Sequence, residues 1–85
     1  MARRRMFSLD IVDSDQFTEL PITTRLLYFE LGSRGDDDGF IANPKKIAKF
    51  ADRSEEDIKT LVDKGFVYVF DSGPLVIRHW LAHNQ

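Results

Sequence analysis

The chain has 85 residues, with 12 lysines and arginines against 14 aspartates and glutamates and a formal net charge of −2. That length allows one domain with one modest core, and the near-neutral charge excludes nucleic-acid affinity that rests on bulk charge alone. The sequence has no cysteine, which excludes disulfides and thiolate zinc sites, and no apolar run approaches the ~20 residues of a membrane span. We therefore expect one small cytoplasmic domain over residues 1–85 that does not enter a membrane.

The first half of the chain predicts a basic lead-in, two helices and a short strand. Residues 3–5 are three arginines that form an arm or lead into a short strand. Capping-box spacing predicts a short helical turn over 14–20. After Pro21, apolar residues recur at three- and four-residue spacing and predict a helix over 22–33. An apolar run between turn residues then predicts a strand over 39–42.

The second half predicts two further helices and a hairpin. An Asn-Pro pair resembles an N-cap with proline at N1 and predicts a helix over 44–50. Another helix begins after Ser54, and Gly65 is a typical residue to end it. Aromatic and β-branched runs over 66–70 and 75–80 flank a turn and predict a β-hairpin. The side chains that we expect to face the core are Leu26, Ile47, Phe50, Ile58, Leu61, Val62, Phe66 and Ile77.

This order of elements is helix, short strand, helix, tight turn, helix and hairpin. Two short helices joined by residues 51–53 are typical of a helix-turn-helix, and the hairpin that follows supplies a wing. The predicted strand near residue 40 can add to the hairpin and make a small antiparallel sheet. We therefore expect an α+β winged helix-turn-helix fold with three main helices.

Five stretches of the sequence resemble one known pattern: residues 4–15 (RRMFSLDIVDSD), 27–29 (LYF), 36–40 (DDDGF), 43–47 (NPKKI) and 79–84 (HWLAHN). Together they resemble the N-terminal region of phage and prophage replisome organisers, which are replication proteins of Gram-positive bacteria related to the DnaD-like primosome proteins. The resemblance implies that the chain is the N-terminal domain of a longer replication protein. It also implies three partners: DNA of the origin region, host helicase-loading or primosome proteins, and further copies of the same protein.

Basic residues suggest where DNA would bind. Lys45 and Lys49 are one helical turn apart and share a face, so both can reach phosphates. The candidate DNA-binding residues are Arg3, Arg4, Arg5, Lys45, Lys46, Lys49, Arg53 and Arg78. The alternatives are a solvated helix face for the lysines and a basic N-terminus without contacts for the first three arginines.

The third helix departs from a groove-reading helix, which offers basic or amide side chains near its N-terminus. Its first turn carries Glu55, Glu56 and Asp57, and their carboxylates would repel phosphate oxygens. These three residues are instead candidates for contact with a protein partner. Two functions therefore remain open: a DNA-binding module, and an interaction or self-association module of the same fold without direct DNA contact.

Other chemistry finds less support in the sequence. Three consecutive aspartates before Gly39 are more typical of a tight turn than of a metal site, and His79 and His83 lack a third ligand. We place His79 in the last strand of the hairpin and expect Trp80 to anchor the chain end over the core. A glycine-rich phosphate loop, a nucleophile elbow and a credible acid–base pair are all missing from the sequence. We expect neither enzymatic activity nor a cofactor.

Overall fold

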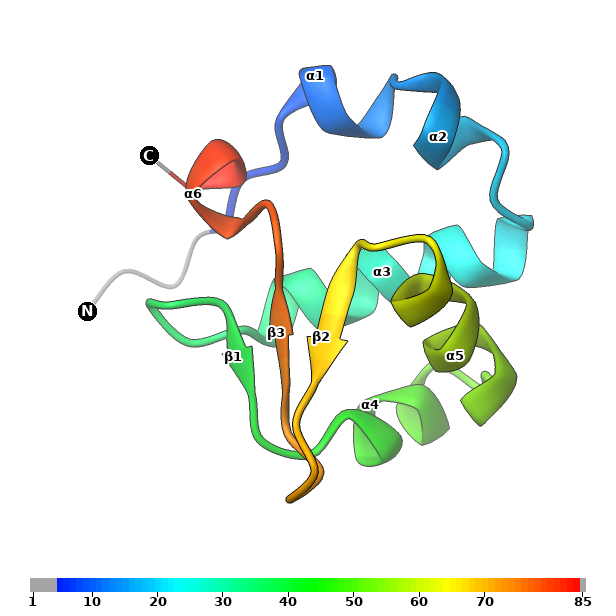
Figure 1. The fold of residues 1–85 in the computed structure, drawn as a ribbon, viewed down its shortest axis with the longest axis vertical. Helices are drawn as coiled ribbons and strands as arrows, with labels where there is room; N and C mark the ends of the chain where they lie inside the picture. Colours follow the sequence, from blue (N-terminus) through cyan, green and yellow to red (C-terminus); the bar gives the residue numbers. More distant parts are fainter. Residues whose placement is uncertain (1–4, 85) are drawn as a thin grey trace.

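The computed structural model describes residues 5–84, which form a mixed α+β fold with six helices and one three-stranded antiparallel sheet (Figure 1). In chain order the elements are α1 (Leu9–Val12), α2 (Asp15–Thr18), α3 (Ile22–Arg34), β1 (Phe40–Ile41), α4 (Pro44–Phe50), α5 (Glu55–Asp63), β2 (Val67–Val69), β3 (Leu75–Ile77) and α6 (Trp80–His83). The predicted α+β class and the order of the main helices and strands are confirmed. Arg3 and Arg4 lie outside the described residues.

The sheet has the order β1-β3-β2, with β3 in the centre. Val76 on β3 pairs with Phe40 on one side and with Tyr68 on the other. Because successive side chains of a strand point to opposite faces, these three residues share the outer face. The inner face carries the residues that are buried against the helices: Ile41, Val67, Leu75 and Ile77.

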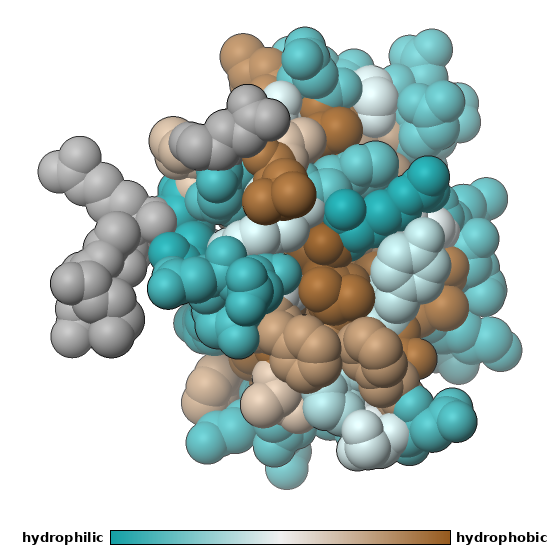
Figure 2. All heavy atoms as spheres, turned by 60° about the vertical axis from the view of Figure 1, so that its left-hand side comes forward, coloured by the Kyte–Doolittle hydropathy of each residue, from teal (hydrophilic) through white to brown (hydrophobic). Residues whose placement is uncertain are grey.

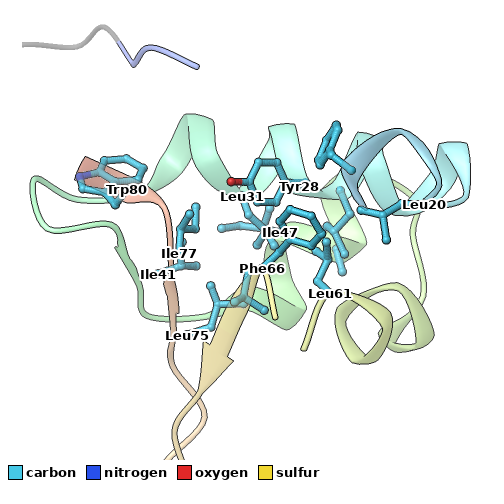
Figure 3. Close-up of a cluster of buried hydrophobic side chains, with 14 residues drawn as sticks. Leu20, Tyr28, Leu31, Ile41, Ile47, Leu61, Phe66, Leu75, Ile77 and Trp80 are labelled. Atoms are coloured by element: carbon cyan, nitrogen blue, oxygen red, sulfur yellow. The ribbon is translucent and has the colours of Figure 1, made fainter. Parts of the chain in front are cut away.

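The core lies between the inner face of the sheet and α3, which also packs against α4 and α5 (Figure 3). One face of α3 is buried through Thr24, Leu27, Tyr28 and Leu31. Leu61 of α5 is fully buried against this face. The expected inward positions of Ile47, Leu61, Phe66 and Ile77 are confirmed, and Ile58 is partly buried against the core.

Three of the expected core residues are exposed. Leu26 is 44% exposed because α3 is apolar on more than one side, and the helix buries its Tyr28 side instead. Phe50 is 64% exposed, at the last turn of α4, and the cationic groups of Arg34 and Lys46 each lie 5.8 Å from its ring centroid. Val62 is exposed as well. In such short helices, apolar spacing does not decide which side meets the core.

After the arginine stretch, which was expected to be an arm or to lead into a short strand, the structure has the helix α1, and α2 confirms the helical turn predicted over 14–20. Ser8 caps α1 by accepting the N–H of Asp10 at 3.2 Å. Ser14 caps α2 by accepting the N–H of Phe17 at 3.2 Å. The serine caps at Ser8 and Ser14 therefore fix where these two short helices begin.

The second strand of the hairpin ends earlier than expected, and His79 is the N-cap of α6 rather than a strand residue. Trp80 turns inward at this point, and its Nε1 donates to the carbonyl oxygen of Asp37 at 2.9 Å. The ring packs so closely on Gly39 that an added Cβ there would lie 2.5 Å from it. Trp80 therefore anchors the chain end over the core, as predicted.

Candidate nucleic-acid interface

The lysines of α4 lie on its outer side because the opposite side is buried through Pro44, Ile47 and Ala48. The Asn43 side chain caps the helix by accepting the N–H of Lys46 at 3.3 Å. The predicted Asn-Pro start of this helix is confirmed. All three lysine side chains are exposed: Lys45, Lys46 and Lys49.

The turn between α4 and α5 brings the acidic start of α5 next to these lysines. Asp52 has a positive φ of 56°, and the following N–H, of Arg53, donates to the carbonyl oxygen of Ala48 at 2.7 Å. This left-handed residue reverses the chain in the way that glycine does at many helix ends. As a result, Nζ of Lys45 lies 3.4 Å from a carboxylate oxygen of Glu55.

A shallow hollow of about 670 Å³ opens between the two helices. Its charged lining residues are Lys45, Lys46, Lys49, Arg53, Glu55 and Glu56. The surface is thus mixed, with cations from α4 on one side and carboxylates from α5 on the other. The exposed Lys45–Glu55 pair contributes little stability, since both groups remain hydrated.

Asp57 is not part of this surface. Its carboxylate is buried, and one oxygen accepts the hydroxyl groups of Thr24 at 2.8 Å and Thr23 at 3.2 Å. Arg53 Nη1 lies 4.0 Å from the other oxygen. Asp57 therefore ties α5 to α3 and supports the fold, and only Glu55 and Glu56 of the three acidic candidates are exposed.

Arg53 lies between the buried carboxylate of Asp57 and the hollow between α4 and α5. It is partly buried by its approach to Asp57, and it also lines the hollow. Within residues 5–84, its buried Nε has no hydrogen-bond partner.

The other basic candidates lie away from α4. Arg5 donates through Nε to the carbonyl oxygen of Gly35 at 3.0 Å, and its guanidinium lies 5.5 Å from the ring centroid of Trp80. Arg78 donates to the carbonyl oxygen of Gly65 at 3.4 Å and lines a separate hollow. The structure therefore does not bring Arg5, Arg78 and the α4 lysines into one patch.

The residues considered for metal binding have structural roles. One carboxylate oxygen of Asp36 accepts the N–H of Asp38 at 2.8 Å and that of Phe40 at 2.9 Å, which confirms the predicted tight turn. His83 is buried and hydrogen-bonded to Tyr28 and Ser8. Over residues 5–84, no group of three or more histidine, cysteine, aspartate or glutamate side chains could hold a metal ion.

The sequence analysis did not identify the outer face of the sheet as a candidate site. Phe40, Tyr68 and Phe70 are all exposed there or at its margin. The alternation over 66–70, with Phe66 expected on the inward side, places Tyr68 and Phe70 inward as well, and this was wrong: Phe66 and Val67 are both buried, and Tyr68 and Phe70 are exposed.

Neither the protein-family models, nor the curated proteins, nor the solved structures include a match to this chain. The family resemblance therefore stays a prediction, and the functional argument rests on the geometry of the described residues. In that part of the chain, no helix has the length and apolarity needed to cross a membrane.

Proposed function

We propose that the chain is a non-enzymatic winged helix-turn-helix module that binds duplex DNA during the initiation of replication. In this interpretation, α4, the turn at Asp52 and α5 are the helix-turn-helix, and the β2–β3 hairpin is the wing. The order of elements from α3 to β3 supports it. The setting in phage DNA replication, with origin DNA and host primosome proteins as partners, rests on the sequence resemblance alone.

The observation that carries DNA binding is the exposure of Lys45, Lys46 and Lys49 on one short helix. Phosphate contacts by lysine supply affinity that does not depend on sequence, and they position a protein on the duplex. The buried side of α4 fixes the helix against the core, so the three amines are presented from a rigid element.

The acidic start of α5 argues against base reading by that helix. Glu55 and Glu56 are exposed there and would face phosphates if α5 entered the major groove. We therefore assign the main contact to α4 and not to α5. Glu55 already pairs with Lys45, so DNA has to compete with this carboxylate for the lysine.

A triple variant tests this assignment. Lys45→Ala, Lys46→Ala and Lys49→Ala together should weaken binding to duplexes of any sequence to the same extent, because phosphates are the same in all of them. Lys59→Ala is the control, since Lys59 is an exposed lysine of α5 that does not line the α4 hollow. Equal affinity of the triple variant and the unsubstituted protein would exclude α4 as the DNA face.

The alternative function is a protein-interaction or self-association module of the same fold. The exposed carboxylates of Glu55 and Glu56 favour it, because such groups steer a basic partner. Glu55→Gln with Glu56→Gln distinguishes the two functions. Tighter DNA binding with unchanged self-association supports DNA docking near α5, whereas weaker association with unchanged DNA binding supports a protein partner there.

A further inference from the structure

The outer face of the sheet carries aromatic side chains that the fold does not use. Phe40 is 38% exposed, Tyr68 54% and Phe70 45%, and they come from β1, from β2 and from the residue after β2. The rings of Phe40 and Phe70 are stacked, with centroids 5.3 Å apart and planes 23° apart. Figure 2 shows brown and tan atoms gathered on the side of the molecule where β1 lies in Figure 1.

The sheet presents these rings in a regular arrangement. Phe40 and Tyr68 both pair with Val76, so they flank the central strand on the same face. Phe70 extends the row past the end of β2, where its N–H donates to the carbonyl oxygen of Pro74 at 2.8 Å and begins the turn. Hydrogen bonds of the backbone therefore hold the strands that carry these rings, and all three side chains remain partly exposed.

Cations lie beyond the end of the sheet where β3 ends and β2 begins. Arg78 directly follows β3, two residues after Val76, and its side chain is exposed. Its guanidinium is held by the carbonyl oxygen of Gly65 at 3.4 Å, and it lines a hollow of about 380 Å³ with Lys64 and His79. Asp10 is the carboxylate that lines this hollow.

We propose that this face is a platform for single-stranded nucleic acid, on which unpaired bases stack against Tyr68, Phe70 and Phe40 while Arg78 and Lys64 contact the phosphates. Aromatic rings accept any base because each base has a flat π-face, and a nearby cation tracks the backbone. The proposal goes beyond duplex binding by α4, because it uses other residues and another ligand.

The size of the patch favours this ligand over a second copy of the chain. Phe and Tyr side chains each bury roughly 150–250 Å² at a contact, so three rings that are about half exposed present on the order of 300 Å². A stable protein pair buries about 800 Å² on each partner. Two or three stacked bases, in contrast, need a contact area no larger than the exposed surface of the rings.

The experiment measures binding of the protein to an oligothymidylate and an oligouridylate of about ten nucleotides each, the size range of common single-strand sites. Tyr68→Ala with Phe70→Ala should weaken this binding by roughly ten-fold or more, because each lost ring removes one stacked base. Arg78→Gln should lower the log–log salt slope by about 0.7, as expected for one lost phosphate contact on a single strand. Ile22→Ala is the control, because Ile22 is an exposed apolar residue of α3.

A second variant keeps the test valid if the alanine variant loses stability. Tyr68→Leu with Phe70→Leu retains apolar volume and removes the rings, so it should lose single-strand affinity to the same extent while the protein remains folded. Full affinity in this variant, or no binding of either oligonucleotide by the unsubstituted protein, would overturn the proposal.

Conversion of a dimer to a monomer by these substitutions would also overturn it, since the face would then be a self-association surface. The α4 lysine variant separates the two proposals, because it should impair duplex binding and leave stacking on the sheet intact.

Discussion

The hydroxyl oxygen of Tyr28 lies 2.6 Å from Nε2 of His83, which comes 55 positions later in the chain. The other ring nitrogen of His83, Nδ1, accepts the N–H of Ser8 at 2.7 Å. Because Nδ1 is an acceptor, the proton of the neutral ring is on Nε2 and is donated to Tyr28. This one imidazole therefore joins α6, the start of α1 and the centre of α3.

The first prediction concerns the hydrogen bond itself. Tyr28→Phe keeps the ring contacts but leaves the buried Nε2–H of His83 without its acceptor, which should cost roughly 1–3 kcal/mol in free energy of unfolding. Tyr68→Phe is the matched control, since its hydroxyl is on an exposed side chain, and it should change stability by less than about 0.5 kcal/mol. Urea denaturation followed by the fluorescence of the buried Trp80 measures both variants. Equal effects would show that the Tyr28–His83 bond does not stabilise the fold.

The second prediction concerns pH. Burial, and to a lesser degree the charge of His79, lowers the pKa of His83 below its usual value. The unfolded chain, with a histidine pKa of about 6.5, therefore binds more protons than the folded chain below that pH. The contribution of neutral His83 to the free energy of unfolding should therefore be complete above pH ~6.5. It should decrease as the pH falls from there towards the lower pKa of the folded state.

The pH dependence of unfolding free energy, measured between about pH 7.5 and about pH 5.5, checks this expectation. The pKa of His79 is also lowered, by burial and then by Arg78, so both histidines contribute. His83→Gln should flatten most of the dependence, and His79→Gln should leave the part that belongs to His83. A constant stability over this range would contradict the neutral, buried state of His83.

The third prediction concerns the link between α5 and α3. Asp57→Ala removes the acceptor of the buried Thr24 hydroxyl and the partner of Arg53. Because both groups are then left unpaired, unfolding free energy should fall by roughly 1–3 kcal/mol. Glu56→Ala, at the exposed neighbouring position, should cost less than about 1 kcal/mol through the helix dipole alone. A similar small loss at both positions would show that Asp57 has no structural role.

The fourth prediction concerns the core. Leu61 is fully buried, so Leu61→Ala should cost roughly 2–5 kcal/mol in unfolding free energy, through lost burial and the cavity left behind. Val62→Ala, at the next and exposed position, should cost much less. Chemical denaturation of the two variants compares them directly. A loss below about 1 kcal/mol for Leu61→Ala would mean that the side of α5 that faces the core is different.

The sequence predicted helices and strands well where the start or end of the element is set by residues adjacent in the chain. Pro44 begins α4, and Gly65, which follows the C-cap residue Lys64 of α5, has a φ of 81°, as expected for a glycine that terminates a helix. The α1 turn was missed although its Ser8 cap is local, and the α6 turn was missed because it depends on partners distant in sequence. Trp80, for example, turns away from β3 to pack on Gly39, which lies 41 positions earlier.

The candidate site was predicted only in part for the same reason. The exposure of Lys45 and Lys49 follows from helical spacing alone. The burial of Asp57 does not, because its partners Thr23 and Thr24 belong to another helix and lie more than thirty positions away. Helical spacing also does not tell whether Arg53 binds a ligand at the surface or stabilises the fold. In the structure, Arg53 both lies near Asp57 and lines the hollow.

The salt dependence of duplex binding tests the central claim most directly. If Lys45, Lys46 and Lys49 each contact a phosphate, the logarithm of the association constant should fall with the logarithm of salt concentration, with about 0.9 of slope for each contact. Replacing all three lysines by alanine should therefore reduce the magnitude of the slope by about 2.7. The same slope in the triple variant and in the unsubstituted protein would contradict DNA binding through α4.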